Sequence, residues 1–209
     1  MFGDIYTKQN EAKFTIGHYV SDKTIKVNKL NGISNIRYID ISSINNQTNE
    51  ITSYSYYKTN ERPSRAQQVV ESGDILISTV RPNLNNVAIV KDSLNNMVAS
   101  TGFCVLKNNP NYNSYFLFTL IRDQRFADYL SKLTTGASYP AVNNKAILDF
   151  KVDFPPIELQ NKFADFVKHI DKLKFYEKNT TFFENLCYNI IKNIHFTVKK
   201  RWKWLILNF

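Results

Sequence analysis

The residues that could perform catalysis are few in this sequence, and they do not form a recognisable set. The six glycines are scattered, so the sequence has no glycine-rich phosphate-binding loop. Two cysteines, Cys104 and Cys187, and three histidines stand at unrelated spacings, whereas a zinc site needs closely spaced ligands. The histidines are His18, His169 and His195. We therefore expect no metal site in this chain.

Acidic residues offer two weak candidates for nuclease chemistry. Glu11 and Lys13 have the E-x-K spacing with Asp4 upstream, but so short a match is frequent by chance and lacks a strand–turn–strand context. Asp149 and Asp153 alternate with apolar residues, which indicates a strand rather than a carboxylate pair. The Asn-Pro-Pro-aromatic motif of amino-methyltransferases is absent. We predict a non-catalytic chain, with an autonomous nuclease as the less favoured alternative.

The composition describes a folded, basic protein. Of the 209 residues 43% are hydrophobic and 14% aromatic, which is enough to bury a core. The net charge of +9 favours a polyanionic partner such as nucleic acid, although a lysine-rich composition alone gives the same excess. The N-terminus has no apolar signal segment, and no run approaches the ~18 apolar residues of a membrane span. We expect a cytoplasmic protein with free, buried thiols and no membrane association.

Residues 1–154 have the pattern of a mixed α/β body. Short runs rich in β-branched residues predict a meander of antiparallel strands. Apolar residues at helical spacing predict one helix over residues 114–133 that packs on the sheet, followed by a polar loop to Pro140. The predicted strands cover residues 38–44, 74–80, 87–90 and 102–106.

A long helix is predicted after Pro155 and Pro156, where the composition changes. Glu158 lies where an acidic side chain favours the positive end of the helix dipole. Apolar residues then step by four and three, as in a coiled coil, and the pattern resumes out of phase after Leu173. The predicted pairing seam is Leu159, Phe163, Phe166, Ile170, Leu173, Phe183 and Ile190.

This helix is too long to lie entirely on its own domain. About 35 residues span about 50 Å, so we expect the helix to dock against another helix. We divide the chain into a body (1–154), the helix (155–197) and a basic, apolar tail (198–209). The tail is consistent with a helix terminus, a membrane-surface patch or, our preferred interpretation, the end of a shortened reading frame. The expected fold class is α+β, with a mixed, largely antiparallel body followed by a long coiled-coil-type helix.

Several segments, in their order and spacing, resemble the specificity (S, HsdS) subunit of type I restriction-modification systems. The resemblance covers about residues 20–195, and the combined pattern is specific although each piece alone is weak. The segments are Tyr38–Ser42, Pro63–Ala66, Gly73–Asn83, Ala99–Phe103, Gly136–Val142 and Pro155–Gln160.

The resemblance implies a subunit that reads DNA for partner enzymes. A complete specificity subunit has two target recognition domains, each followed by a helix, and the paired helices set the distance between two half-sites. Methyltransferase subunits methylate adenine with S-adenosylmethionine, and restriction subunits use ATP and Mg²⁺; this chain itself is expected to bind no cofactor. One recognition domain and one helix imply a half-length subunit that pairs with a second copy or another half subunit. The alternative is a truncated scaffold that occupies methyltransferase subunits without reading DNA.

For such a domain, polar loop residues are the candidates for reading double-stranded DNA. Arginine can bind guanine and asparagine adenine through two hydrogen bonds in the major groove. Arg81 and Tyr139 belong to the recurring framework, so a role in shaping turns or in phosphate binding remains open for them. The candidate residues are Ser64, Arg65, Gln67, Arg81, Asn83, Asn85, Asn86, Ser138, Tyr139, Asn143, Asn144 and Lys145.

Overall fold

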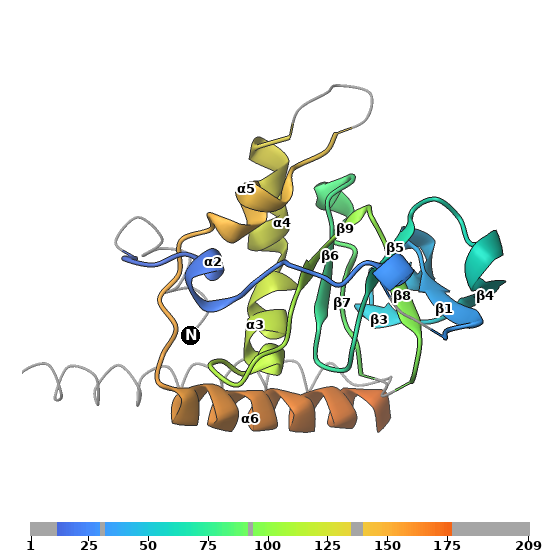
Figure 1. Cartoon of the computed structure of the whole chain (residues 1–209). Coiled ribbons are helices and arrows are strands. Elements are labelled where there is room, and N and C mark those ends of the chain that lie inside the picture. Colours follow the sequence, from blue (N-terminus) through green and yellow to red (C-terminus); the bar gives the residue numbers. More distant parts are fainter. Residues whose placement is uncertain (1–11, 30–31, 92–93, 135–139, 177–209) are drawn as a thin grey trace, which may run out of the picture.

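The computed structural model describes residues 12–29, 32–91, 94–134 and 140–176. Two small sheets and a set of helices form layers above a long helix that runs along one side (Figure 1). The predicted α+β class, mixed and largely antiparallel, is confirmed. No helix within the described ranges is long and apolar enough to cross a membrane.

The first sheet has the strand order β4-β1-β8-β5. β1 pairs with β8 in parallel, and the other two pairs are antiparallel. The parallel pair departs from the predicted antiparallel meander, because the chain between β1 and β8 crosses to the second sheet and back. The strands are β1 (Asn35–Ile39), β4 (Ser55–Lys58), β5 (Ala66–Val69) and β8 (Met97–Ser100).

The second sheet has the order β7-β6-β9 and is antiparallel throughout. A short hairpin of β2 and β3 lies beside β7. All three strands of this sheet were predicted, each one or more residues longer than observed. The strands are β6 (Ile75–Ser78), β7 (Val87–Ile89), β9 (Phe103–Leu106), β2 (Ile44–Asn45) and β3 (Glu50–Ile51).

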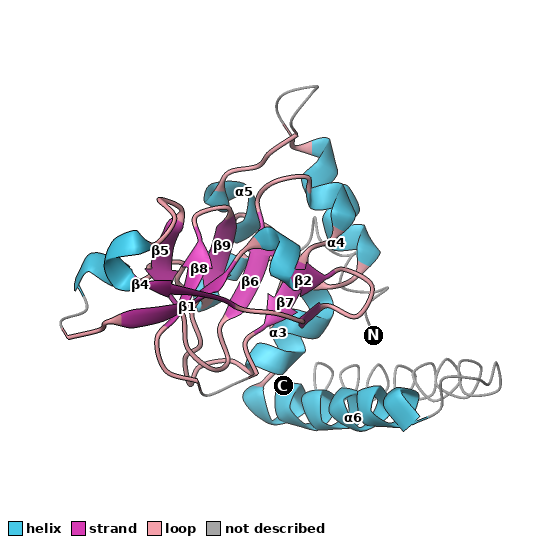
Figure 2. Ribbon diagram, turned by 90° about the vertical axis from the view of Figure 1, so that its right-hand side faces the viewer, coloured by secondary structure: helices cyan, strands magenta, loops and turns pink. Residues whose placement is uncertain are grey.

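Helices cover one face of the second sheet (Figure 2). The α-helices are α2 (Ile16–Tyr19), α3 (Ser114–Ile121), α4 (Gln124–Lys132), α5 (Asn144–Leu148) and α6 (Ile157–Tyr176). The 3-10 helices are η1 (Val27–Lys29), η2 (Ile41–Ser43), η3 (Thr59–Glu61) and η4 (Pro82–Leu84).

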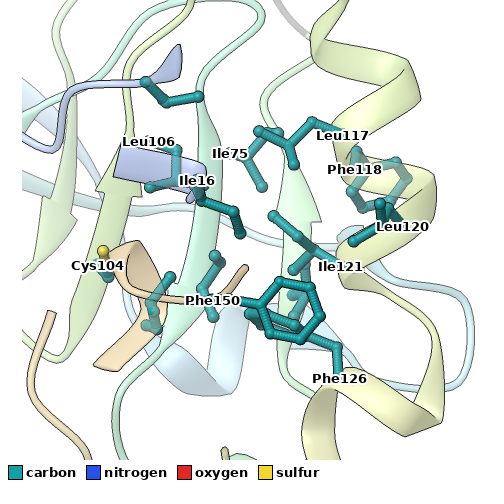
Figure 3. Packing of buried hydrophobic residues seen from close by; sticks show 14 of the residues in the cluster. Ile16, Ile75, Cys104, Leu106, Leu117, Phe118, Leu120, Ile121, Phe126 and Phe150 are labelled. Atoms are coloured by element: carbon teal, nitrogen blue, oxygen red, sulfur yellow. The ribbon is translucent and has the colours of Figure 1, made fainter. Parts of the chain in front are cut away.

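The second sheet is buried on both faces. Ile75 and Ile77 of β6 belong to the larger core, together with Phe118, Phe126 and other side chains of the helices. Figure 3 shows Ile75 facing these helices. Leu76, between them, packs instead against the first sheet. This alternation follows from the two-residue period of a strand. Because both faces of β6 are buried, its sequence is a continuous apolar run rather than an alternation of apolar and polar residues.

Two predicted elements are interrupted by aspartates that cap a helix. The predicted strand 38–44 ends at Asp40, whose carboxylate accepts a hydrogen bond from the backbone of Ile41 and starts η2. The predicted helix 114–133 is wrong as a single element, because Asp123 begins a separate helix, α4. In both places the aspartate side chain accepts a hydrogen bond from a backbone N–H group at the start of the new helix. The preceding element therefore ends there.

Asp123 also gives a pH-dependent prediction. Burial alone would raise the pKa of its carboxyl group, but hydrogen bonds from the side chain and the backbone of Arg125 outweigh burial and hold the pKa below its ordinary value. We expect Asp123→Ala to lower the free energy of unfolding by about 1 kcal/mol at pH 7, the usual value of a lost N-cap.

The sign of the pH dependence follows from the lowered pKa. The carboxylate stabilises the fold fully above the pKa of an unfolded aspartate, about 3.9. This stabilisation is lost as the pH falls through the lower, folded pKa. Thermal unfolding of wild type and Asp123→Ala should therefore converge only below about pH 4. A difference in melting temperature that is the same at pH 7 and pH 3 would contradict this account.

Candidate nucleic-acid interface

Polar turns from both sheets meet at one edge of the domain, which we call the distal edge. β6 begins on the side of the domain where α6 lies and ends at this edge (Figure 1). The distal edge and α6 are therefore at opposite ends of β6. Backbone hydrogen bonds tie the turns together: Thr79 donates to Gly102, and Thr101 donates to Arg65, both at 2.9 Å. The edge consists of residues 46–48, 64–67, 79–86, 100–102 and 140–145.

The most prominent part of the distal edge is the turn around η4, between β6 and β7. Arg81 and Asn85 flank η4 with φ of 48° and 52°, in the left-handed region that costs a residue with a side chain about 1–2 kcal/mol. Between them Pro82 is buried, whereas Asn83 and Leu84 are exposed, as is Arg81. Such strain persists only where neighbouring contacts enforce it, and it is common at functional sites.

Contacts with two other segments, the turn between β2 and β3 and the end of α3, enforce this conformation. The Asn85 side-chain amide donates to the carbonyl of Arg122 at 2.7 Å, and the Asn85 carbonyl accepts from Nδ2 of Asn49 at 3.2 Å. The Leu84 carbonyl accepts from Nδ2 of Asn46 at 3.0 Å. The amide donor of Asn85 is thus already engaged, so this candidate for base contact holds the turn in place.

The same contacts identify polar residues that the sequence analysis missed. Asn46, Gln47 and Thr48, in the turn between β2 and β3, are exposed and lie beside η4. The available signal was the polar run Asn45–Asn49, which separates two apolar segments. A polar run is typical of any surface turn, so only the hydrogen bond from Asn46 to Leu84 places it at the distal edge.

The candidates before β5 are also at this edge. Ser64 and Arg65 are exposed, and Gln67 donates from its side chain to the Ser64 carbonyl at 2.8 Å. Beneath them burial raises the pKa of the Tyr38 hydroxyl, with Arg65 acting in the opposite direction. Tyr38 therefore stays neutral near pH 7, and Arg65 is the charged group that reaches the surface here.

The candidates that follow Pro140 have partners within the domain. Asn143 caps α5 by accepting from the backbone of Ala146 at 2.9 Å, and Asn144 donates to Asp22 at 2.9 Å. Lys145 forms an ion pair with Asp149 and is exposed. Arg81 donates its backbone N–H to Pro140 at 2.8 Å, so this segment adjoins the η4 turn. The remaining candidates, Ser138 and Tyr139, lie outside the described residues.

The chemistry of the distal edge is hydrogen bonding and cationic attraction. Arg65 and Arg81 can bind phosphates or guanine, and Ser64, Asn83 and Asn86 can form hydrogen bonds with base edges. The structure describes no group of histidine, cysteine, aspartate or glutamate side chains that could hold a metal ion. This arrangement is suited to binding a nucleic acid.

The carboxylates considered for nuclease chemistry do not converge in the described part of the chain. Asp149 pairs with Lys145, and Asp153 accepts from the backbone N–H groups of Lys13 and Phe14, both at 3.1 Å. Asp153 thus fastens the start of the described chain to the segment before α6. Asp4 and Glu11 lie outside the described residues.

The predicted pairing seam of α6 is divided in the structure. Phe163 is buried against the Phe116 ring, 5.7 Å between centroids, so it packs within the domain and does not face outward. Phe166 is half-buried and packs partly on the same cluster. Of the other seam residues, Leu159 and Ile170 are half-buried and Leu173 is exposed, and none of the three belongs to a hydrophobic cluster of the described residues; we call these three the outward seam. Phe183 and Ile190 lie outside the described residues.

Comparison with protein-family models gives a match over residues 14–196 to a family described as "Type I restriction modification DNA specificity domain". Among curated proteins, the HindI type I restriction enzyme specificity subunit of Haemophilus influenzae is 26% identical over 144 residues, covering 68% of this chain and 31% of that protein. The MjaVIII specificity subunit of Methanocaldococcus jannaschii is 30% identical over 112 residues, covering 51% and 26%. The matched part of the chain thus spans between about a quarter and a third of the length of these relatives.

Solved structures show the same similarity. The HsdS subunit of Thermoanaerobacter tengcongensis matches with a TM-score of 0.68 and 30% identity, over 78% of this chain and 43% of that one. A chain from a study of complex assembly and conformational transition of the type I R-M system matches with a TM-score of 0.66 and 29% identity, over the same shares. In both cases the chain resembles the solved structure in sequence as well as in fold.

Proposed function

Because the chain belongs to the family of type I restriction-modification DNA specificity domains, we propose that it reads one half-site of an interrupted DNA target and directs methyltransferase subunits to it. The observation that carries this proposal is the strained, exposed η4 turn, which presents Arg81 and Asn83 at the distal edge. The chain itself performs no catalysis in this proposal. S-adenosylmethionine belongs to the methyltransferase subunits, and ATP with Mg²⁺ to restriction subunits where these are present.

The proposed division of labour follows the predicted domains. Residues 1–154 read DNA, and the helix that begins at Ile157 pairs with the helix of a second half subunit and carries the methyltransferase subunits. Two identical halves related by a twofold axis would read a palindromic, interrupted site, whereas two different halves would read an asymmetric one. Pairing of two α6 helices is supported by apolar side chains that the domain does not cover fully. Leu173 is exposed and Ile170 is half-buried.

The test is methylation of a duplex library. The purified chain is mixed with its methyltransferase subunits, S-adenosylmethionine and duplexes with randomised half-sites and spacers of varied length. We expect methylation at one defined, interrupted sequence. A complex that assembles but methylates without sequence preference would identify the chain as the non-reading scaffold and would refute the proposal.

Arg81→Gly tests the η4 turn directly. Glycine adopts the left-handed conformation without cost, so this change removes the side chain without adding backbone strain to the turn. If Arg81 binds a guanine, discrimination at that base pair falls by about 1–3 kcal/mol. Binding to duplexes that differ at single positions measures the loss. The control is Lys162→Ala, which removes an exposed positive charge from α6. Alanine is used at this position because glycine would destabilise the helix.

The two possible roles of Arg81 give different binding profiles. A phosphate contact would weaken all duplexes equally and lower the slope of log affinity against log salt by about 1. A base contact would change the preference at one position. Unchanged affinity and preference in Arg81→Gly would remove the η4 turn from the proposed interface.

A further inference from the structure

The helix α6 is attached to the domain near its start through a buried glutamine. Gln160 is 3% exposed; its Oε1 accepts from the backbone N–H of Asn113 at 2.9 Å, and its Nε2 donates to Pro155 at 2.7 Å. The side chain of Asn113 also donates to Asn161 at 2.8 Å. Phe163 and Val167 continue this contact along the next two turns.

A second attachment lies further along the helix, at Asp171. Its carboxylate accepts from the Tyr115 hydroxyl at 2.6 Å and from both terminal nitrogens of Arg122, at 3.1 and 3.3 Å. Burial, and then the bond to Asp171, raise the pKa of Tyr115, so its hydroxyl remains a donor. The Arg122 guanidinium also lies over the Phe118 ring, 5.4 Å from its centroid. Three turns of helix, about 16 Å, separate Asp171 from Gln160.

Arg122 is joined to the distal edge as well as to α6. Its backbone carbonyl accepts the hydrogen bond from Asn85 that holds the η4 turn. A single residue at the end of α3 therefore links the second attachment of α6 to the turn that carries Arg81 and Asn83. The link consists of two hydrogen-bonded contacts, Asp171 to Arg122 and Arg122 to Asn85.

We propose that Arg122 and Asp171 are positioning residues that fix the direction of α6 relative to the η4 turn and thereby select the spacer length of the DNA target. This inference rests on the proposed function. Contacts at both ends of the docked segment define the direction of α6, whereas contacts from Gln160 to Val167 alone leave its far end without a fixed position. A tilt of about 10° over the ~30 Å of a 20-residue helix displaces its end by about 5 Å, more than the 3.4 Å between base pairs. The displacement that follows loss of the second attachment is therefore large enough to change the preferred spacer length.

Methylation of duplexes with fixed half-sites and spacers of varied length tests the proposal in the full complex. Wild type should methylate one spacer length, and Asp171→Ala and Arg122→Gln should raise the relative rates at one base pair more or less by about tenfold, within the usual range of coupling between two sites. Arg122→Lys, which keeps the charge, should restore part of the selectivity. Lys162→Gln, which removes an exposed charge from the same helix, should behave as wild type.

A measurement without DNA or partners makes the inference independent of activity. Spin labels at Asn83→Cys and His169→Cys, in the full chain with Cys187→Ser, report the distance from the η4 turn to the part of α6 beyond its first attachment, where a tilt moves the helix most. Cys104 is buried and burial raises its pKa, so it resists labelling. The distance distribution should broaden in Asp171→Ala and Arg122→Gln.

The outcomes separate this inference from the proposed function. Wild-type methylation at a defined sequence, together with unchanged spacer preference and unchanged label distances in both variants, would overturn the positioning role alone. Methylation without sequence preference in wild type would instead overturn the proposed function. A loss of half-site preference in the variants, with spacer preference retained, would also contradict the positioning role.

Discussion

Replacing Asp74 with alanine is expected to lower the free energy of unfolding by about 3–5 kcal/mol, because it removes a buried carboxylate that pairs with a partly buried lysine and accepts from two backbone N–H groups. Asp74 is fully buried and accepts from Nζ of Lys107 at 2.6 Å. It also accepts from the backbone N–H groups of Glu71 and Asn108, both at 2.9 Å. Alanine would leave these three donors without their acceptor. Urea denaturation measures the loss.

The matched control for this prediction is Glu71→Ala. Glu71 meets the same lysine at 3.4 Å, but its side chain is 73% exposed, so its loss should cost less than about 1 kcal/mol. Asp74→Asn, which keeps one acceptor oxygen, should lie between the two. Equal losses in Asp74→Ala and Glu71→Ala would show that the buried carboxylate does not stabilise the junction between β6 and β9.

The second large effect is expected at Ile170. Under the proposed function this residue lies in the contact between two α6 helices, where a carboxylate would be buried without a partner. Ile170→Asp should therefore convert the paired chain to a monomer and abolish targeted methylation. Sedimentation velocity of the purified chain measures the first result, and the duplex library measures the second.

His169→Asp is the control that separates pairing from folding. It places the same charge one residue away, at an exposed position of α6, and should leave the molecular mass in solution unchanged. Phe163 and Phe166 are unsuitable probes, because both contact the Phe116 cluster and their replacement would also detach α6. If Ile170→Asp sediments as wild type does, the outward seam is not a pairing surface.

The parts of the fold that the sequence predicted are those set by local patterns. Ile75–Ser78 and Phe103–Leu106 are runs of apolar and β-branched residues, which indicate strands wherever they pack. The break at Asp123 could not be seen in the same way. Phe116 and Leu120 before it and Phe126 after it are all buried, so the apolar spacing continues through two helices as if through one.

The candidate site was predicted only as far as side-chain type allows. Arg81 and Asn83 were selected because they follow a strand, and both are exposed at the distal edge. The different role of Asn85 depends on Arg122, 37 residues away, and the proximity of Asn46 depends on the hairpin that carries it. Contacts between distant segments leave no trace in the spacing of either segment.

The construction of the η4 turn has a consequence for how such a domain can diversify. Its frame is held by the carbonyls of Leu84 and Asn85, by the amide of Asn85 and by buried Pro82. The exposed side chains of Asn83 and Leu84 project from that frame. Under the proposed function, substitutions at these two positions alter the chemistry offered to DNA while the frame is inherited unchanged. New target preferences then lie within one or two mutations of the old one, and selection can explore them without first losing a stable protein.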